Sequence, residues 1–140
     1  MAIKNYTSTV SPLVSLGEIQ AALAAHGAKK IMTEHDEKGF PTSVAFLVDT
    51  PAGPRSFLIE ANITGVLRTF KKQKIKEDHD QAARTGWRNV RDWVLAQMAI
   101  IEAGMATMDE VFFPYLTDRN GSTVYKLYSS GGLMLGDGTV

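Results

Sequence analysis

Hydrophobic positions change period along the chain, from helical spacing to strand-like alternation and back again. Apolar side chains first recur three or four residues apart, at Leu16, Ile19 and Leu23, as on one face of a helix, and Gly27 follows where such a helix would end. Ser15 and Glu18 stand at the spacing of a capping box. We therefore expect a helix over residues 16–26 that begins after Ser15.

Alternation with a period of two marks three strands, over residues 29–35, 42–50 and 55–60. Short turns rich in glycine and proline separate them, so neighbouring strands are expected to be antiparallel. The second strand is apolar on both sides, with Phe46 on one and Leu47 on the other. It is therefore expected at the centre of a meander, with helices covering at least one face.

Helical spacing returns after the strands. Asn62 is a suitable cap for a helix that continues to about Gln73, and a polar connector follows over residues 74–80. A long helix is expected over residues 81–103, ended by Gly104.

The last third of the chain has shorter elements. Thr107 and Glu110 repeat the capping-box spacing before a short helix that Pro114 bends or stops. Residues 123–129 suit either a last helical turn or an edge strand. The pattern predicts an α+β fold of order α-β-β-β-α-α, with one compact domain over residues 1–130 and a flexible glycine-rich tail over residues 131–140.

The long helix carries three lines of side chains. The first is apolar and comprises Ala83, Trp87, Val90, Val94, Met98, Ile101 and Met105. Trp93 and Ile100 form a second apolar line, away from the first. One sheet needs one apolar face, so the second line predicts another covering layer, interpreted as a second copy of the chain in a homo-oligomer.

Arginines form the third line, at Arg84, Arg88 and Arg91, and two interpretations of them remain open. They lie at i,i+4 spacing from acids, in the pairs Asp80–Arg84 and Arg88–Asp92, as on a solvated, salt-paired face. Alternatively, they line a pocket for phosphates, which the planar guanidinium fork matches well. In the second interpretation Lys71 and Lys72 from the preceding helix join them, and Trp87 or Trp93 stacks on a base.

The charged residues are balanced over the whole chain but unevenly distributed along it. The chain has 140 residues, with 15 cations, 15 acids and no net charge. Residues 68–91 nevertheless hold eight cations against three acids, a local net charge of +5. The lysines of this stretch also suit a helix C-terminus, where the dipole favours cations. A neutral total argues against a protein that coats nucleic acid, but a local site for an anion remains open.

Motifs of catalysis and metal binding are missing from the sequence. There is no cysteine, and the three histidines lack metal-ligand spacing. No phosphate-binding glycine motif or nucleophile elbow is present. We expect no enzyme activity, no cofactor and no metal. The N-terminus lacks the apolar core of a signal peptide and no window is long enough to span a membrane, so a cytoplasmic protein is expected.

Four phrases, "NYTSTV", "GEIQAALAAHGAKKIM", "GWRNVRDWVLAQMAIIEAGM" and "DEVFFPYL", resemble a group of short proteins encoded by tailed bacteriophages and prophages. The likeness covers roughly residues 3–128. It implies a phage accessory protein acting in a bacterial host cytoplasm, and it assigns no activity and no functional residues.

The leading hypothesis is a non-catalytic protein that sequesters a small anionic, nucleotide-like ligand, such as a defence signal. Arg84, Arg88 and Arg91 would bind the phosphates. An alternative is single-stranded nucleic-acid binding along the same basic ridge, in phage replication or recombination. Another is inhibition of a host protein through the aromatic cluster at residues 112–116 or the acidic C-terminal third.

Overall fold

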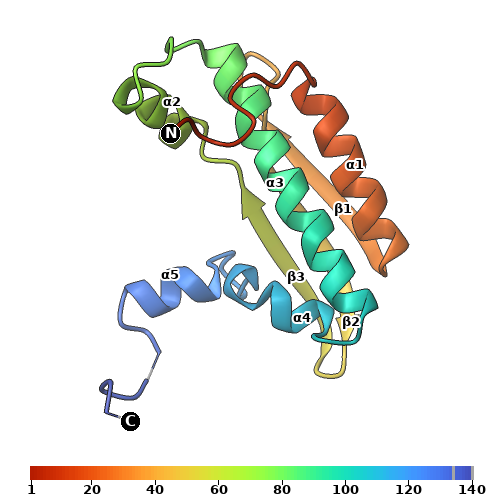
Figure 1. The fold of residues 1–140 in the computed structure, drawn as a ribbon. Helices are drawn as coiled ribbons and strands as arrows, with labels where there is room; N and C mark the ends of the chain where they lie inside the picture. The colour runs from red at the N-terminus through yellow and green to blue at the C-terminus, as the bar shows by residue number, and fades with distance from the viewer. Residues whose placement is uncertain (134, 140) are drawn as a thin grey trace.

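The computed structural model describes residues 1–133 and 135–139. Its elements are α1 (Pro12–Ala25), β1 (Ala28–His35), β2 (Pro41–Thr50), β3 (Gly53–Glu60), α2 (Ile63–Lys72), α3 (His79–Glu102), α4 (Met108–Val111), the 3-10 turn η1 (Phe113–Tyr115) and α5 (Val124–Ser129). Figure 1 shows α1 and α3 side by side across one face of the sheet. The tail expected over residues 131–140 includes Met134 and Val140, which lie outside the described residues.

The three strands form one antiparallel sheet of order β1-β2-β3, so β2 is central as its two apolar sides predict. In the register Phe46 of β2 lies opposite Ile31 of β1 and Phe57 of β3. The α+β class and the order of helices and strands are thereby confirmed.

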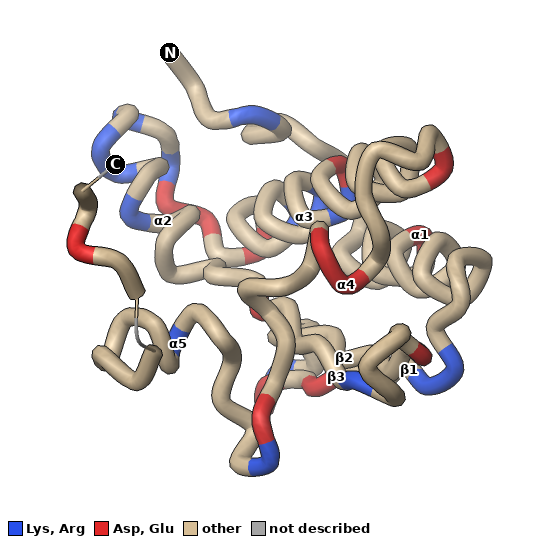
Figure 2. The backbone as a smooth tube through the Cα atoms, turned by 90° about the horizontal axis from the view of Figure 1, so that it is seen from below, with Lys and Arg blue, Asp and Glu red and all other residues tan. Residues whose placement is uncertain are grey.

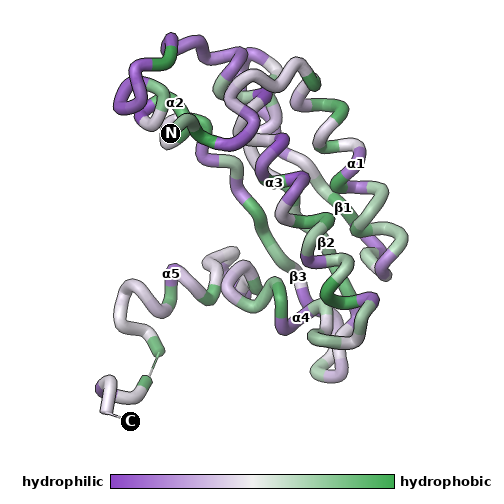
Figure 3. Tube along the Cα trace, viewed as in Figure 1, coloured by the Kyte–Doolittle hydropathy of each residue, from purple (hydrophilic) through white to green (hydrophobic). Residues whose placement is uncertain are grey.

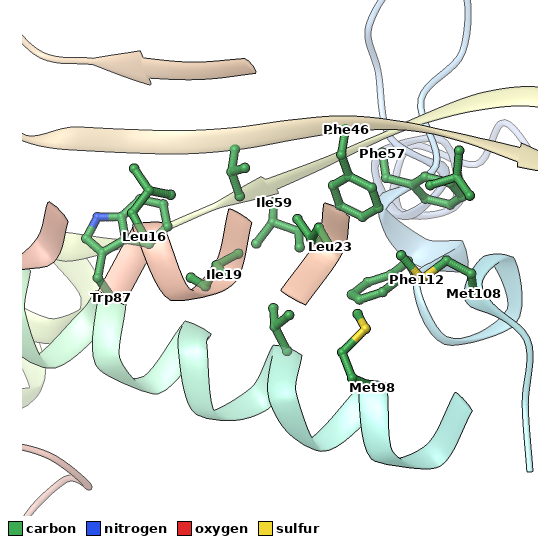
Figure 4. Close-up of a cluster of buried hydrophobic side chains, with 13 residues drawn as sticks. Leu16, Ile19, Leu23, Phe46, Phe57, Ile59, Trp87, Met98, Met108 and Phe112 are labelled. Atoms are coloured by element: carbon green, nitrogen blue, oxygen red, sulfur yellow. The ribbon is translucent and has the colours of Figure 1, made fainter. Parts of the chain in front are cut away.

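The core lies between the helices and the inner face of this sheet. Figure 4 shows Trp87 and Met98 of α3 directed toward the strands, with Phe112 beneath Phe46 and Phe57. The rings of Phe46 and Phe57 stack at 5.3 Å between centroids, and Phe112 meets Phe46 edge to face at the same distance. Burying each side chain of this size contributes about 1.5–3 kcal/mol relative to its exposed state, so this layer dominates the stability of the fold.

The first helix begins earlier than the sequence pattern predicts. Ser11 is its N-cap and accepts a hydrogen bond from the Leu13 amide (3.2 Å), while Pro12 occupies the first turn. Proline suits that position because the amide it lacks has no helical partner there. Ser15, expected as the cap, is instead a fully buried residue within α1, and its hydroxyl has no hydrogen-bond partner among the described residues. The predicted capping box at Ser15 is wrong.

The helix α2 packs closely on α3 because Gly86 has no side chain. A Cβ atom at Gly86 would lie 2.9 Å from Cδ1 of Ile63 and 3.4 Å from Cγ2 of Val66. The cap of α2 is Asn62, as predicted, and α3 is capped by Asp78, so it begins at His79. The sequence alone does not indicate this role of Gly86, because the close approach depends on Ile63 and Val66 from another element.

One member of the second apolar line of α3 is covered by the same chain. Trp93 meets Phe112 and Tyr115 edge to face, at 5.5 Å between centroids in each case. Phe112 follows α4 and Tyr115 belongs to η1, so Trp93 needs no second copy to cover it, whereas Ile100 is half-buried. Met105, predicted on the first apolar line, is 69% exposed because α3 ends at Glu102.

The C-terminal elements settle the remaining alternatives. The capping box of Thr107 and Glu110 is present, and residues 124–129 form a helix, not an edge strand. The Thr123 side chain caps that helix. No helix in the described part of the chain combines the length and apolarity required to cross a bilayer.

Candidate functional site

The arginines predicted to bind phosphates contact carboxylates of their own chain. Glu18 of α1 accepts hydrogen bonds from Nη1 of Arg88 (2.7 Å) and from Nε of Arg91 (2.9 Å). The side chains of Arg88 and Arg91 are only 20% and 26% exposed. The two guanidinium groups therefore hold α1 against α3 and have one anionic partner already in place.

A second carboxylate completes this network. Asp92 accepts from Nη1 of Arg91 (3.0 Å) and from Nδ2 of Asn5 (2.9 Å), and it also pairs with Lys4. The N-terminal segment is thus tied to α3.

Arg84 is bound differently. Its Nε donates to the carbonyl of Ser8 (3.2 Å) and its Nη2 to Oε1 of Gln81 (2.7 Å). The ion pairs Asp80–Arg84 and Arg88–Asp92, predicted from i,i+4 spacing, are therefore not the ones formed. The reason is tertiary: α1 brings Glu18 between two arginines, and the N-terminal segment lies against the third.

The electrostatics of the network agree with its geometry. Partial burial raises the pKa of Glu18, but hydrogen bonds from Arg88 and Arg91 outweigh this effect and bring the pKa below its usual value. Burial likewise raises the pKa of Asp92, and hydrogen bonds from Lys4, Asn5 and Arg91 lower it to about 2. Both carboxylates are ionised at neutral pH and neutralise the arginines.

The two tryptophans are occupied by packing. Trp87 is 0% exposed, and its Nε1 donates to the carbonyl of Pro41 (2.9 Å). Trp93 is half-buried against the rings of Phe112 and Tyr115. Trp87 has no free face on which a base can stack, and Trp93 has aromatic neighbours of its own.

Lys71 and Lys72 lie in a different place from the arginine row. They belong to an exposed group that we call the basic ridge, formed by the end of α2 and the residues after it. Its members are Arg68, Lys71, Lys72, Lys74 and Lys76. Figure 2 shows this group at the end of α2, apart from the cations along α3. Within residues 1–133 and 135–139, none of the five forms an ion pair.

The backbone at the centre of the ridge is strained. Lys74 has a φ of +60°, in the left-handed region where glycine is the residue of lowest cost. The amide of Lys74 donates to the Lys71 carbonyl (3.2 Å), and the amide of Ile75 to the Phe70 carbonyl (2.8 Å). This is a Schellman-type helix end with lysine at the usual glycine position. Lysine occupies this position although glycine would adopt the same conformation at a lower free-energy cost.

A hollow of about 550 Å³ adjoins the ridge. Its lining includes Lys72, Thr69 and Gln73 of the α2 end, together with Met1 and Ala2. The N-terminal segment is held there by a hydrogen bond from the Ile3 amide to Oε1 of Gln73 (2.8 Å). Figure 3 shows that most residues around this end of α2 are hydrophilic, in contrast to the hydrophobic stretches along β3 and at the end of α3.

The remaining aromatic and acidic residues are divided between the core and the surface. Phe112 of the aromatic cluster is fully buried in the core, whereas Phe113 is 52% exposed. Glu102, at the end of α3, is exposed and pairs with Nε2 of His26 (2.8 Å). Among the residues that the structure describes, no three histidine, aspartate or glutamate side chains are grouped so as to hold a metal ion.

The ridge is the feature that sequence analysis captured only in part. The net charge of residues 68–91 indicated a basic region, but it combined arginines held within the protein with lysines that pair with no described acid. Exposure and ion pairing separate the two groups. Comparisons with protein-family models, with curated proteins and with solved structures find no match for this chain.

Proposed function

We propose that the protein is a non-catalytic binding protein whose basic ridge contacts the phosphates of a single-stranded nucleic acid. The observation that carries the proposal is five exposed cations within residues 68–76, a stretch with no acid, none of them in an ion pair with a described residue. Solvated cations on one ridge release condensed counterions from a phosphate backbone when they bind it, and this release supplies most of the affinity.

The open shape of the ridge favours an extended ligand. Its side chains project from a helix end and a turn, not from the walls of a closed pocket, so successive phosphates can follow it. The strained Lys74 supports the same view, because strain that persists in a fold is commonly kept at functional positions. In the setting that the resemblance to phage proteins implies, the ligand is a strand exposed during phage replication or recombination.

The test is fluorescence anisotropy with a labelled single-stranded oligonucleotide over a series of salt concentrations. Five phosphate contacts predict a slope of log affinity against log salt of about −3.5, or about 0.7 for each contact. Replacing Lys71 and Lys72 by glutamine should reduce the slope by about 1.4. The matched control is Lys38→Gln with Arg119→Gln, which removes two exposed cations from turns elsewhere. Absence of binding at low salt, or equal weakening by the control, refutes the proposal.

A second candidate is the small nucleotide-like ligand, which the hollow beside Lys72 favours. The arginine row and Trp87 are engaged within the protein, so such a ligand would depend on Lys72 and Thr69 instead. Competition separates the two candidates. A mononucleotide that displaces the oligonucleotide at comparable concentration supports the hollow, whereas affinity that grows with strand length supports the ridge.

A further inference from the structure

The outer face of the sheet has no helix over β1 and β2 among the described residues. Figure 2 shows α1 and α3 on one side of the sheet, with α5 beside β3. Strand alternation and register place three rows of side chains on the opposite face. They are Lys30, Leu47 and Ser56, then Met32, Ala45 and Leu58, then Glu34, Ser43 and Glu60. Met32 is 62% exposed, an unusual position for a large apolar side chain at the middle of a strand.

An apolar band crosses this face perpendicular to the strands. Met32 pairs with Ala45, and Ala45 pairs with Leu58. A hollow of about 310 Å³ borders Met32, Ala45 and Leu47, and another of about 310 Å³ borders Leu58 and Tyr125 of α5. The band therefore continues from the edge strand β1 to the exposed ring of Tyr125.

Opposite charges flank the band at equal spacing. Lys30 lies two residues before Met32 on β1, and Glu34 lies two residues after it. Neither forms an ion pair within residues 1–133 and 135–139, and both are exposed. If a second copy were placed on this face by a two-fold rotation about an axis along the band, Lys30 of each copy would lie over Glu34 of the other. The interface would then contain two such ion pairs.

The same rotation places Leu47 of one copy over Ser43 of the other, which is 7% exposed, and Ser56 over Glu60, which already pairs with Lys126 of its own chain. Opposite charges at equal distances from an axis allow a surface to pair with itself, as in an isologous dimer. We propose that the outer sheet face binds a second copy of this chain, face to face about the Met32 row.

This proposal is independent of the basic ridge. The ridge lies at the end of α2, and α2 packs on α3 in the helical layer. It also differs from the homo-oligomer inferred from the second apolar line of α3, because that line lies on a helix that covers the opposite face of the sheet, and Phe112 and Tyr115 contact its Trp93.

The experiment is sedimentation velocity over a range of protein concentrations, with circular dichroism to verify folding. The wild-type chain should sediment as a dimer. Lys30→Glu places like charges opposite each other twice and should raise the dimer dissociation constant at least about tenfold, as should Glu34→Lys. The double variant Lys30→Glu with Glu34→Lys restores both pairs and should dimerise as the wild type does. Lys38→Glu is the matched control, since it makes the same charge change outside this face.

Met32→Arg provides a test that does not depend on the charge pairs, because Met32 lies on the proposed axis and its exposure makes the substitution compatible with folding. It should give a monomer. A wild-type monomer at every concentration overturns the proposal. A dimer that survives Met32→Arg, or a double variant no better than the single ones, also overturns it.

Discussion

Replacing Lys74 by glycine should change stability and ligand binding in opposite directions. A left-handed conformation costs a residue with a Cβ atom about 1–2 kcal/mol, and Lys74 adopts it with a φ of +60°. Glycine removes that cost but loses about 0.5–1 kcal/mol through the larger entropy of its unfolded chain. The free energy of unfolding should therefore rise by up to about 1.5 kcal/mol. At about 2–4 °C for each kcal/mol in a domain of this size, Tm should rise by up to about 6 °C.

Binding to a single-stranded oligonucleotide should weaken in the same variant, because one of five ridge cations is lost. The slope of log affinity against log salt should fall by about 0.7. The matched control is Lys72→Gly, which removes an equivalent charge from the last turn of α2, where φ is helical. That variant should lose affinity and also lose up to about 1 kcal/mol of stability. Thermal unfolding and anisotropy measure both effects. If Lys74→Gly is less stable than the wild type, or binds equally well, the reasoning about this residue fails.

Three further predictions concern the fold. Ser15→Ala should leave the free energy of unfolding unchanged or raise it by about 1 kcal/mol, because the buried hydroxyl has no partner among the described residues. A urea titration measures this, and a fall of more than about 1 kcal/mol would mean that the hydroxyl makes a hydrogen bond. Gly86→Val should lower the free energy of unfolding by about 1–3 kcal/mol, because the introduced side chain would collide with Ile63. Gly86→Ala should lower it less, and equal losses in the two variants would contradict the close approach of α2 and α3. Asp92 has a pKa lowered from 3.8 to about 2, so its contribution to stability is present above pH 3.8 and is lost as the pH falls toward 2. Acid unfolding followed by circular dichroism should thus be less steep in Asp92→Asn over that interval, and an identical profile would contradict the assignment.

Residues near one another in sequence were the most predictable part of the site. The lysines at residues 71–76 gather because they follow one another at a helix end, and their charge was evident without a structure. Lys74 was predicted only as part of a polar connector. Its positive φ follows from the path that the chain takes between α2 and α3, which no local pattern specifies.

The arginine row was the least predictable part. Its spacing along α3 was correct, but its partners come from elements about 70 residues earlier in the chain. Helical spacing favoured Asp92 for Arg88, whereas the packing of α1 on α3 supplied Glu18 instead. Burial of Trp87 and the covering of Trp93 by η1 follow from the same kind of contact.

The sequence by itself determined the helices, the meander and the central position of β2, because the period of apolar residues reports local geometry and one-sided burial. Only the tertiary structure decided which charges are neutralised and which remain free. Ion pairing depends on distances between atoms remote in sequence: α1 brings Glu18 to 2.7 Å from Nη1 of Arg88, whereas no described acid pairs with the lysines at the end of α2. For this reason the exposed cations of the candidate site lie at the end of α2, whereas the arginines of α3 serve to hold α1 and the N-terminal segment in place.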